Sequence, residues 1–156
     1  MSPDKGAHRA VRVARESGHR LMLAVKMREA AERAYFDDVV RPLLGFDDVL
    51  SVEPPLEERL AMLGGAIALI NPIGWPEPFG LVMVEALASA TPVLAFPNGA
   101  APEIVEHGRT GFLSHDEGDM ISRVGRLHEI RRGACRRAAQ LRFSSFGPLV
   151  GPRCLG

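Results

Sequence analysis

Short apolar runs alternate with longer segments of helical periodicity along most of the chain. The apolar runs are typical of buried parallel strands and lie at 20–25, 49–52, 66–71, 92–96 and 111–113. Between them, segments of helical character lie at 5–17, 28–44, 56–63, 79–89, 102–107 and 116–130. The alternation predicts an α/β fold, a Rossmann-like parallel sheet with helices on both faces. Gly18 should follow the end of the first helix, and Pro42 should kink or end the second.

Both ends of the chain depart from this alternation. The first expected element is a helix, so the strand that should precede it is missing. After Glu129 there is no acidic residue, and the last residues, FGPLVGPRCLG, follow neither a helical nor a strand period. We therefore expect one domain over residues 1–145, without its first strand, and an irregular tail over 146–156.

Composition narrows the class of protein and its partners. A chain of 156 residues is long enough for one domain with a real core. Its formal net charge of zero argues against a nucleic-acid partner. Two cysteines without metal-ligand spacing, no signal peptide and no membrane-length apolar run together predict a cytoplasmic protein.

The most apolar segment contains one carboxylate. Between Pro78 and Pro102, Glu85 is the only charged residue. A buried carboxylate without a partner is costly or becomes neutral, so Glu85 needs a partner. That partner is either a ligand or, in the simpler interpretation, the backbone or an arginine.

The loop that precedes this segment, NPIGWPEPFG, follows a predicted strand, where open α/β sheets bind ligands. A helix beginning near Phe79 would leave the N–H groups of Phe79, Gly80 and Leu81 free for an anion or hydroxyl oxygens. Glu77 and Glu85 would aim two carboxylates at the same place and accept hydrogen bonds from vicinal hydroxyls. Two sugar rings joined by a diphosphate would satisfy this set. The alternative for Glu77 is that it merely caps the helix.

The segment EPFGLVMVEALASATPVLAFPNGAAPEIVEHGRTGFL resembles the C-terminal, donor-binding half of the retaining GT-B glycosyltransferases of family 4, or group 1. The family motif, EPFGLVxxEALAxGTPV, is matched by Glu77 and Glu85, and the opening MSPDKG resembles the family's GRxSPxKG. The resemblance implies transfer of a sugar from a nucleotide-diphosphate-sugar donor to an acceptor hydroxyl, with retention.

The resemblance also implies a role for each site residue. Glu77 would contact the donor sugar, Glu85 the ribose, and Lys5 the diphosphate. The backbone at Phe79, Gly80 and Leu81 would hold the sugar and diphosphate. We place Gly99 at a turn near the ligand. No metal or other cofactor is needed for this chemistry. Lys5 has a simpler interpretation as a solvated surface residue.

Departures from the family limit the expected activity. The acceptor-binding domain is absent, the arginine that accompanies the lysine would fall before Met1, and Ala90 replaces the usual glycine before TPV. We therefore expect the isolated chain to have little or no activity. The alternatives are a non-catalytic nucleotide-sugar-binding module, a subunit of a split transferase with a separate acceptor-binding chain, or an inactive truncated remnant.

Two surface interactions are also considered. A basic stripe of Arg131, Arg132, Arg136 and Arg137 is either a solvated face or a peripheral membrane contact. Apolar surface left by the missing half would favour self-association.

Overall fold

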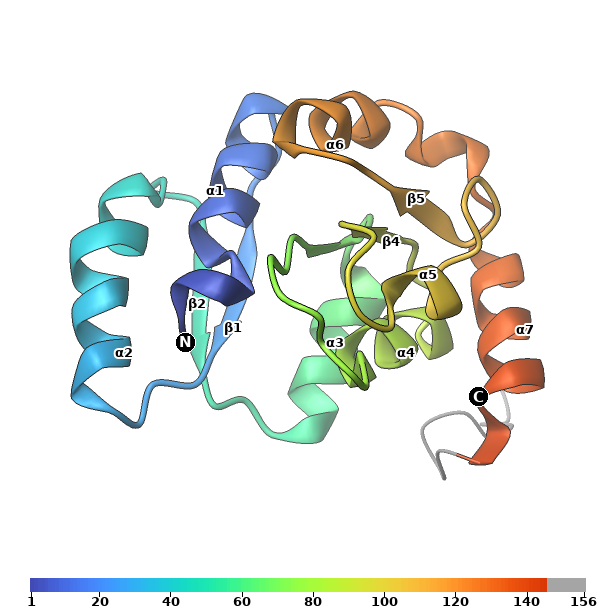
Figure 1. Ribbon diagram of the computed structural model, residues 1–156, viewed down its shortest axis with the longest axis horizontal. Coiled ribbons are helices and arrows are strands. Elements are labelled where there is room, and N and C mark those ends of the chain that lie inside the picture. The colour runs from blue at the N-terminus through green and yellow to red at the C-terminus, as the bar shows by residue number, and fades with distance from the viewer. Residues whose placement is uncertain (146–156) are drawn as a thin grey trace.

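The computed structural model describes residues 1–145, and the tail expected at 146–156 lies outside the described residues. In the described part, parallel strands form two sheets (Figure 1). One sheet pairs β1 (Met22–Val25) with β2 (Val49–Val52), and the other has the order β3 (Leu69–Asn71), β4 (Val93–Ala95), β5 (Gly111–Leu113). The parallel α/β class is confirmed, but the strands are divided between two sheets where one was expected.

The helices overlap the predicted segments, except for Arg132–Arg142, which is helical where no helix was predicted. They are α1 (Ala7–Glu16), α2 (Ala30–Tyr35), α3 (Leu56–Gly65), α4 (Leu81–Ala88), α5 (Ala101–Ile104), α6 (Glu117–Val124) and α7 (Arg132–Arg142). After α2 the chain continues through one π-helical and one 3₁₀ turn and leaves helical geometry just after Pro42, as the proline predicts. Gly18 follows α1 with φ +77°, in the left-handed conformation expected after a helix end.

Helices cover both sides of the three-stranded sheet. Helices α1 and α6 pack together on one side, whereas α3 and α4 pack together on the other (Figure 1). The N-terminus of α6 is fixed by Asp116, whose carboxylate accepts a hydrogen bond from the Asp119 N–H at 2.8 Å. None of the helices in residues 1–145 is long and apolar enough to cross a membrane.

The apolar core consists of two clusters that follow the two sheets. The larger surrounds β4, whose three residues are all fully buried. The smaller is centred on Val11, Phe36 and Val40. Helix α1 belongs to both, because Val13 is buried in the larger cluster and Val11 in the smaller. It is therefore the element that joins the two halves of the molecule.

Candidate functional site

Three loops meet at the carboxyl ends of β3 and β4. The Gly74 N–H donates to the Asp4 carbonyl at 2.8 Å, which joins the start of the chain to the loop after β3. The Asn98 side-chain amide donates to the Ile73 carbonyl at 2.9 Å, which joins that loop to the one after β4. These bonds bring the segments that contain Lys5, Glu77 and Gly99 to one end of the sheet. This is the end at which parallel α/β folds bind ligands.

Two glycines let these loops approach one another backbone to backbone. A side chain at Gly6 would clash with the Pro72 carbonyl, and one at Gly99 would clash with the backbone of Glu77. Both have positive φ, +72° and +54°. Beside Gly99, the Ala100 N–H donates to the Glu77 carbonyl at 2.8 Å. Gly99 thus lies where we expected a turn, and its contact holds the backbone of Glu77 in place.

The carboxylate of Glu77 and the ammonium of Lys5 have no ionic or hydrogen-bonding partner among residues 1–145. Glu77 is half-buried, and Lys5 is exposed at the end of a 3₁₀ turn, Pro3–Lys5. The simpler interpretation of Glu77 as a helix cap is wrong, because the N-cap of α4 is Gly80 and no side chain caps that helix. Whether either side chain binds a ligand stays a prediction.

Helix α4 begins two residues later than predicted. Its first residue is Leu81, and Phe79 lies outside the helix with its side chain 70% exposed. Gly80 precedes the helix with φ +60°, where a side chain would clash with Met83 and Ile104. The free N–H groups at this terminus therefore belong to Gly80, Leu81 and Val82, because the Met83 N–H already donates to the Gly80 carbonyl at 2.9 Å. The predicted donor at Phe79 is not part of the helix end.

Glu85 has an arginine partner. Arg59 of α3 donates from Nε to Oε2 at 3.0 Å and from Nη2 to Oε1 at 2.9 Å. This hydrogen-bonded contact raises the pKa of the Arg59 guanidinium above its usual value. Glu85 itself is 7% exposed, so the pair neutralises a buried carboxylate, as one of the alternatives from the sequence predicted. A ribose hydroxyl would have to share the carboxylate with Arg59.

Arg9 is a further cation that the sequence analysis did not single out. Its guanidinium lies beside the loop after β3, with Nη1 3.4 Å from the Pro72 carbonyl oxygen. The guanidinium carbon also lies over the Phe96 ring, 5.8 Å from the ring centroid. Arg9 comes four residues after Lys5 at the start of a helical segment. That spacing, which places side chains on one face, was the available signal.

Arg132 of the basic stripe makes structural contacts. It donates to the carbonyls of Ala66 at 2.7 Å and Gly64 at 2.8 Å, and to Thr91 Oγ1 at 3.1 Å. The first two acceptors lie at the C-terminal end of α3, so Arg132 satisfies carbonyls that the helix leaves unpaired. Residues 1–145 contain no cluster of three or more histidine, cysteine or acidic side chains suited to a metal ion.

Residues 53–134 match the family model described as "Glycosyl transferases group 1". The chain belongs to this family. Among curated relatives, the D-inositol 3-phosphate glycosyltransferase of Streptomyces scabiei is 45% identical over 76 residues, covering 47% of this chain and 17% of the relative. The enzyme of that name from Streptomyces griseus is 37% identical over 112 residues, covering 67% of this chain and 23% of the relative. The matches thus span about a fifth of these group 1 relatives.

Solved structures share the fold of this chain over nearly its whole length. Sucrose-phosphate synthase from Thermosynechococcus elongatus superimposes with a TM-score of 0.79 at 25% identity, covering 91% of this chain and 39% of that one. AviGT4, a glycosyltransferase involved in avilamycin A biosynthesis, superimposes with a TM-score of 0.69 at 31% identity, covering 88% of this chain and 42% of that one. The Rossmann-like fold predicted for one half of a GT-B transferase is confirmed.

Proposed function

We propose that this chain is the donor-binding half of a cytoplasmic, retaining group 1 transferase that takes a sugar from a nucleotide-diphosphate-sugar and passes it to an acceptor hydroxyl. The observation that carries the proposal is the meeting of three loops at the carboxyl ends of β3 and β4, which gathers Lys5, Glu77 and the start of α4. A structural neighbour, HepE of Anabaena, has been solved with UDP and with UDP-glucose, which supports a donor of this class.

Each group at the site has a role that its chemistry suits. The Lys5 ammonium and the N–H groups of Leu81 and Val82 would bind the diphosphate and stabilise the charge that develops as it leaves. Gly80, without a side chain, would let the sugar approach the backbone. Glu77 would accept hydrogen bonds from sugar hydroxyls, and Glu85 would accept them from the ribose while still paired with Arg59. In this proposal no metal takes part.

Binding, rather than turnover, is the activity we propose for the chain alone. It spans about a fifth of its curated relatives, and the acceptor would be presented by a separate acceptor-binding domain or chain. Closure of that partner over the donor would exclude water and complete the site. The family's own activity would then appear only in the assembled protein.

Calorimetric titration with UDP, GDP and ADP, and with their glucose or mannose conjugates, tests the proposal. We expect saturable binding of one nucleotide. The Glu77→Gln variant should bind the sugar conjugate of that nucleotide about tenfold more weakly, because a charge-assisted hydrogen bond is lost. Glu57→Gln, an exposed glutamate in the first turn of α3, is the matched control. Lys5→Ala should weaken nucleotide and conjugate alike, whereas Lys26→Ala should not. A cooperatively folded chain that gives no heat with any of these ligands would refute the proposal.

A further inference from the structure

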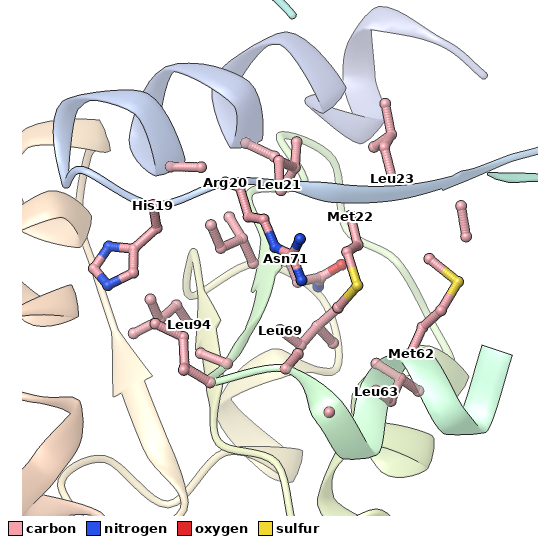
Figure 2. A pocket seen from close by; sticks show the side chains of 18 of the residues that line it. His19, Arg20, Leu21, Met22, Leu23, Met62, Leu63, Leu69, Asn71 and Leu94 are labelled. Carbon is pink, nitrogen blue, oxygen red and sulfur yellow. The ribbon is translucent and has the colours of Figure 1, made fainter. Parts of the chain in front are cut away.

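Arg59, the partner of Glu85, lies at the border of a cavity of about 580 Å³ between the two sheets (Figure 2). Asn71, the last residue of β3, and Val82, in the first turn of α4, line the same cavity. Val82 and Glu85 are three residues apart in α4, so their side chains share one face of the helix. The cavity therefore extends to the ion pair, at the end of the sheet where the three loops of the candidate donor site meet.

The two partners of this ion pair differ in burial. The Arg59 side chain is 37% exposed, whereas the Glu85 side chain is 10% exposed. A partly exposed guanidinium keeps some of its hydration, but a carboxylate this deeply buried has little hydration left. Glu85 is therefore the partner whose charge depends on the pair.

The geometry of the pair leaves the Glu85 carboxylate able to accept further hydrogen bonds. An ionised carboxylate offers about four lone-pair positions over its two oxygens. Arg59 occupies one position on Oε2 and one on Oε1, at 3.0 and 2.9 Å. One position on each oxygen remains for a ligand hydroxyl. Because a planar guanidinium holds both oxygens, the direction of the remaining positions is fixed as well.

Arg59 alone balances the charge of Glu85 in residues 1–145. Its neighbour Glu58 instead accepts a hydrogen bond from Ser51 Oγ at 2.7 Å. Strands β3 and β4, which also pack against α4, contain no charged residue. The thiol of Cys135, on α7, stays neutral below alkaline pH, because burial raises its pKa to about 11. The remaining charged side chains on elements packed against α4 form no ion pair with Glu85 in the described residues; they are Glu57, Glu103, Arg132, Arg136, Arg137 and Arg142.

Stability alone is a weak reason for a carboxylate at this position. Residues 83–87 of α4 are all buried, and Glu85 is the only one of them that is not apolar. Replacing a buried ion pair by apolar side chains of similar volume is often neutral or stabilising, because the buried charge loses its hydration. A requirement for an ionised carboxylate here explains the pair better.

We propose that Arg59 is a positioning residue for nucleotide binding, which keeps the Glu85 carboxylate ionised and fixes the direction from which it accepts a ribose hydroxyl. This inference rests on the proposed function, in which Glu85 binds the ribose. Arg59 acts through Glu85, without a contact of its own to the ligand. Without Arg59, burial favours the protonated carboxyl, which lacks the charge that strengthens a hydrogen bond from a hydroxyl.

The test measures nucleotide-sugar affinity by calorimetry from about pH 8 to about pH 5.5. The probe is whichever of the glucose and mannose conjugates of UDP, GDP and ADP the wild-type chain binds. A conjugate is used instead of the free nucleotide, because a terminal phosphate itself titrates at about pH 6. We expect the wild-type affinity to change little over this range. The affinity of Arg59→Met should fall about tenfold as the pH is lowered, because Glu85 takes up a proton.

Three further variants assign the effect. Arg59→Lys keeps a cation beside Glu85, so it should restore the flat profile. The double variant Arg59→Met, Glu85→Gln has no titrating carboxyl at this place, so it should bind weakly at every pH. Arg28→Met breaks the exposed pair with Glu53 and should match the wild type. Thermal denaturation at each pH establishes that the compared chains are folded. Should Arg59→Met unfold at the lower pH, Arg59→Gln replaces it with the same expected slope.

The outcomes separate a positioning role from a merely structural one. If Arg59→Met weakens binding by the same factor at every pH, Arg59 only supports the fold and the inference is overturned. A pH dependence that persists in the double variant, or that Arg59→Lys does not remove, would overturn it too. A wild-type chain that binds none of the conjugates refutes the proposed function and this inference with it, whereas the other adverse results leave the proposed function standing.

Discussion

Arg59 and Glu85 form a bidentate ion pair, with N–O distances of 3.0 and 2.9 Å, between helices α3 and α4. The two glutamates of the group 1 motif therefore differ in state. Glu85 is buried and neutralised, whereas the Glu77 carboxylate has no partner within residues 1–145. The pair also attaches α3 to α4, the helix whose N-terminus faces the proposed donor site.

Loss of Arg59 should destabilise the fold. Arg59→Met leaves Glu85 buried without its partner, and we expect the free energy of unfolding to fall by about 1–3 kcal/mol. Adding Glu85→Gln should recover part of the loss, because the uncompensated charge is removed. Urea denaturation measures both. Arg28→Met, which breaks the exposed bidentate pair with Glu53, is the control and should change stability by less than about 1 kcal/mol. Similar losses for both arginine variants would contradict this prediction.

Relief of backbone strain at Ala90 should stabilise the chain. Ala90 has φ +61°, the left-handed conformation that costs a residue with a side chain about 1–2 kcal/mol. We expect Ala90→Gly to raise Tm by about 2–4 °C in thermal denaturation. Ala88→Gly, two residues earlier within α4, should lower Tm, because glycine weakens a helix. A lower Tm for Ala90→Gly would show that its side chain contributes more than the strain costs.

Removal of the Arg132 side chain should loosen the end of α3. Arg132→Ala deprives the carbonyls of Gly64 and Ala66 of their donor, and we expect a loss of about 1–2 kcal/mol in urea denaturation. Its exposed neighbour provides the control, since Arg131→Ala removes a similar charge without these contacts. If vesicles of anionic lipid bound the wild-type chain and neither variant, the stripe would instead contact membranes.

The buried thiol of Cys135 should react slowly and make stability sensitive to alkaline pH. Burial raises its pKa from 9.0 to about 11. The unfolded thiol ionises first as the pH rises, so the native state loses stability between these two values and is unaffected below them. We expect Cys135→Ala to reduce the alkaline loss of stability. In a Cys154→Ser background, alkylation of Cys135 at pH 8 should be slow until urea is added. Fast alkylation of the native chain would contradict the burial of this thiol.

The sequence predicts elements well where apolar runs are bounded by clear breaks. The strands Val49–Val52 and Gly111–Leu113 have the predicted bounds. The start of α4 differs by two residues, because Gly80 takes a left-handed conformation and a side chain there would clash with Met83 and Ile104. Such tertiary contacts are not visible in a local pattern.

Contacts between residues far apart in the chain are the other feature that the sequence does not predict. The sequence shows that Glu85 needs a partner and leaves arginine as one option, but Arg59 lies on another helix with no spacing that marks it. Division of the strands into two sheets could not be predicted either, because pairing depends on which edges meet.

Helix α1 contributes Val11 to one core cluster and Val13 to the other. Within residues 1–145 the sheets share no ladder of hydrogen bonds, so we expect cooperativity between the two halves to pass largely through this one helix. Fraying of α1 would release the β1–β2 half as a separate unfolding unit while the β3–β5 half kept its own core. A mutation on this helix would then alter how many steps the molecule takes to unfold, as well as how stable it is.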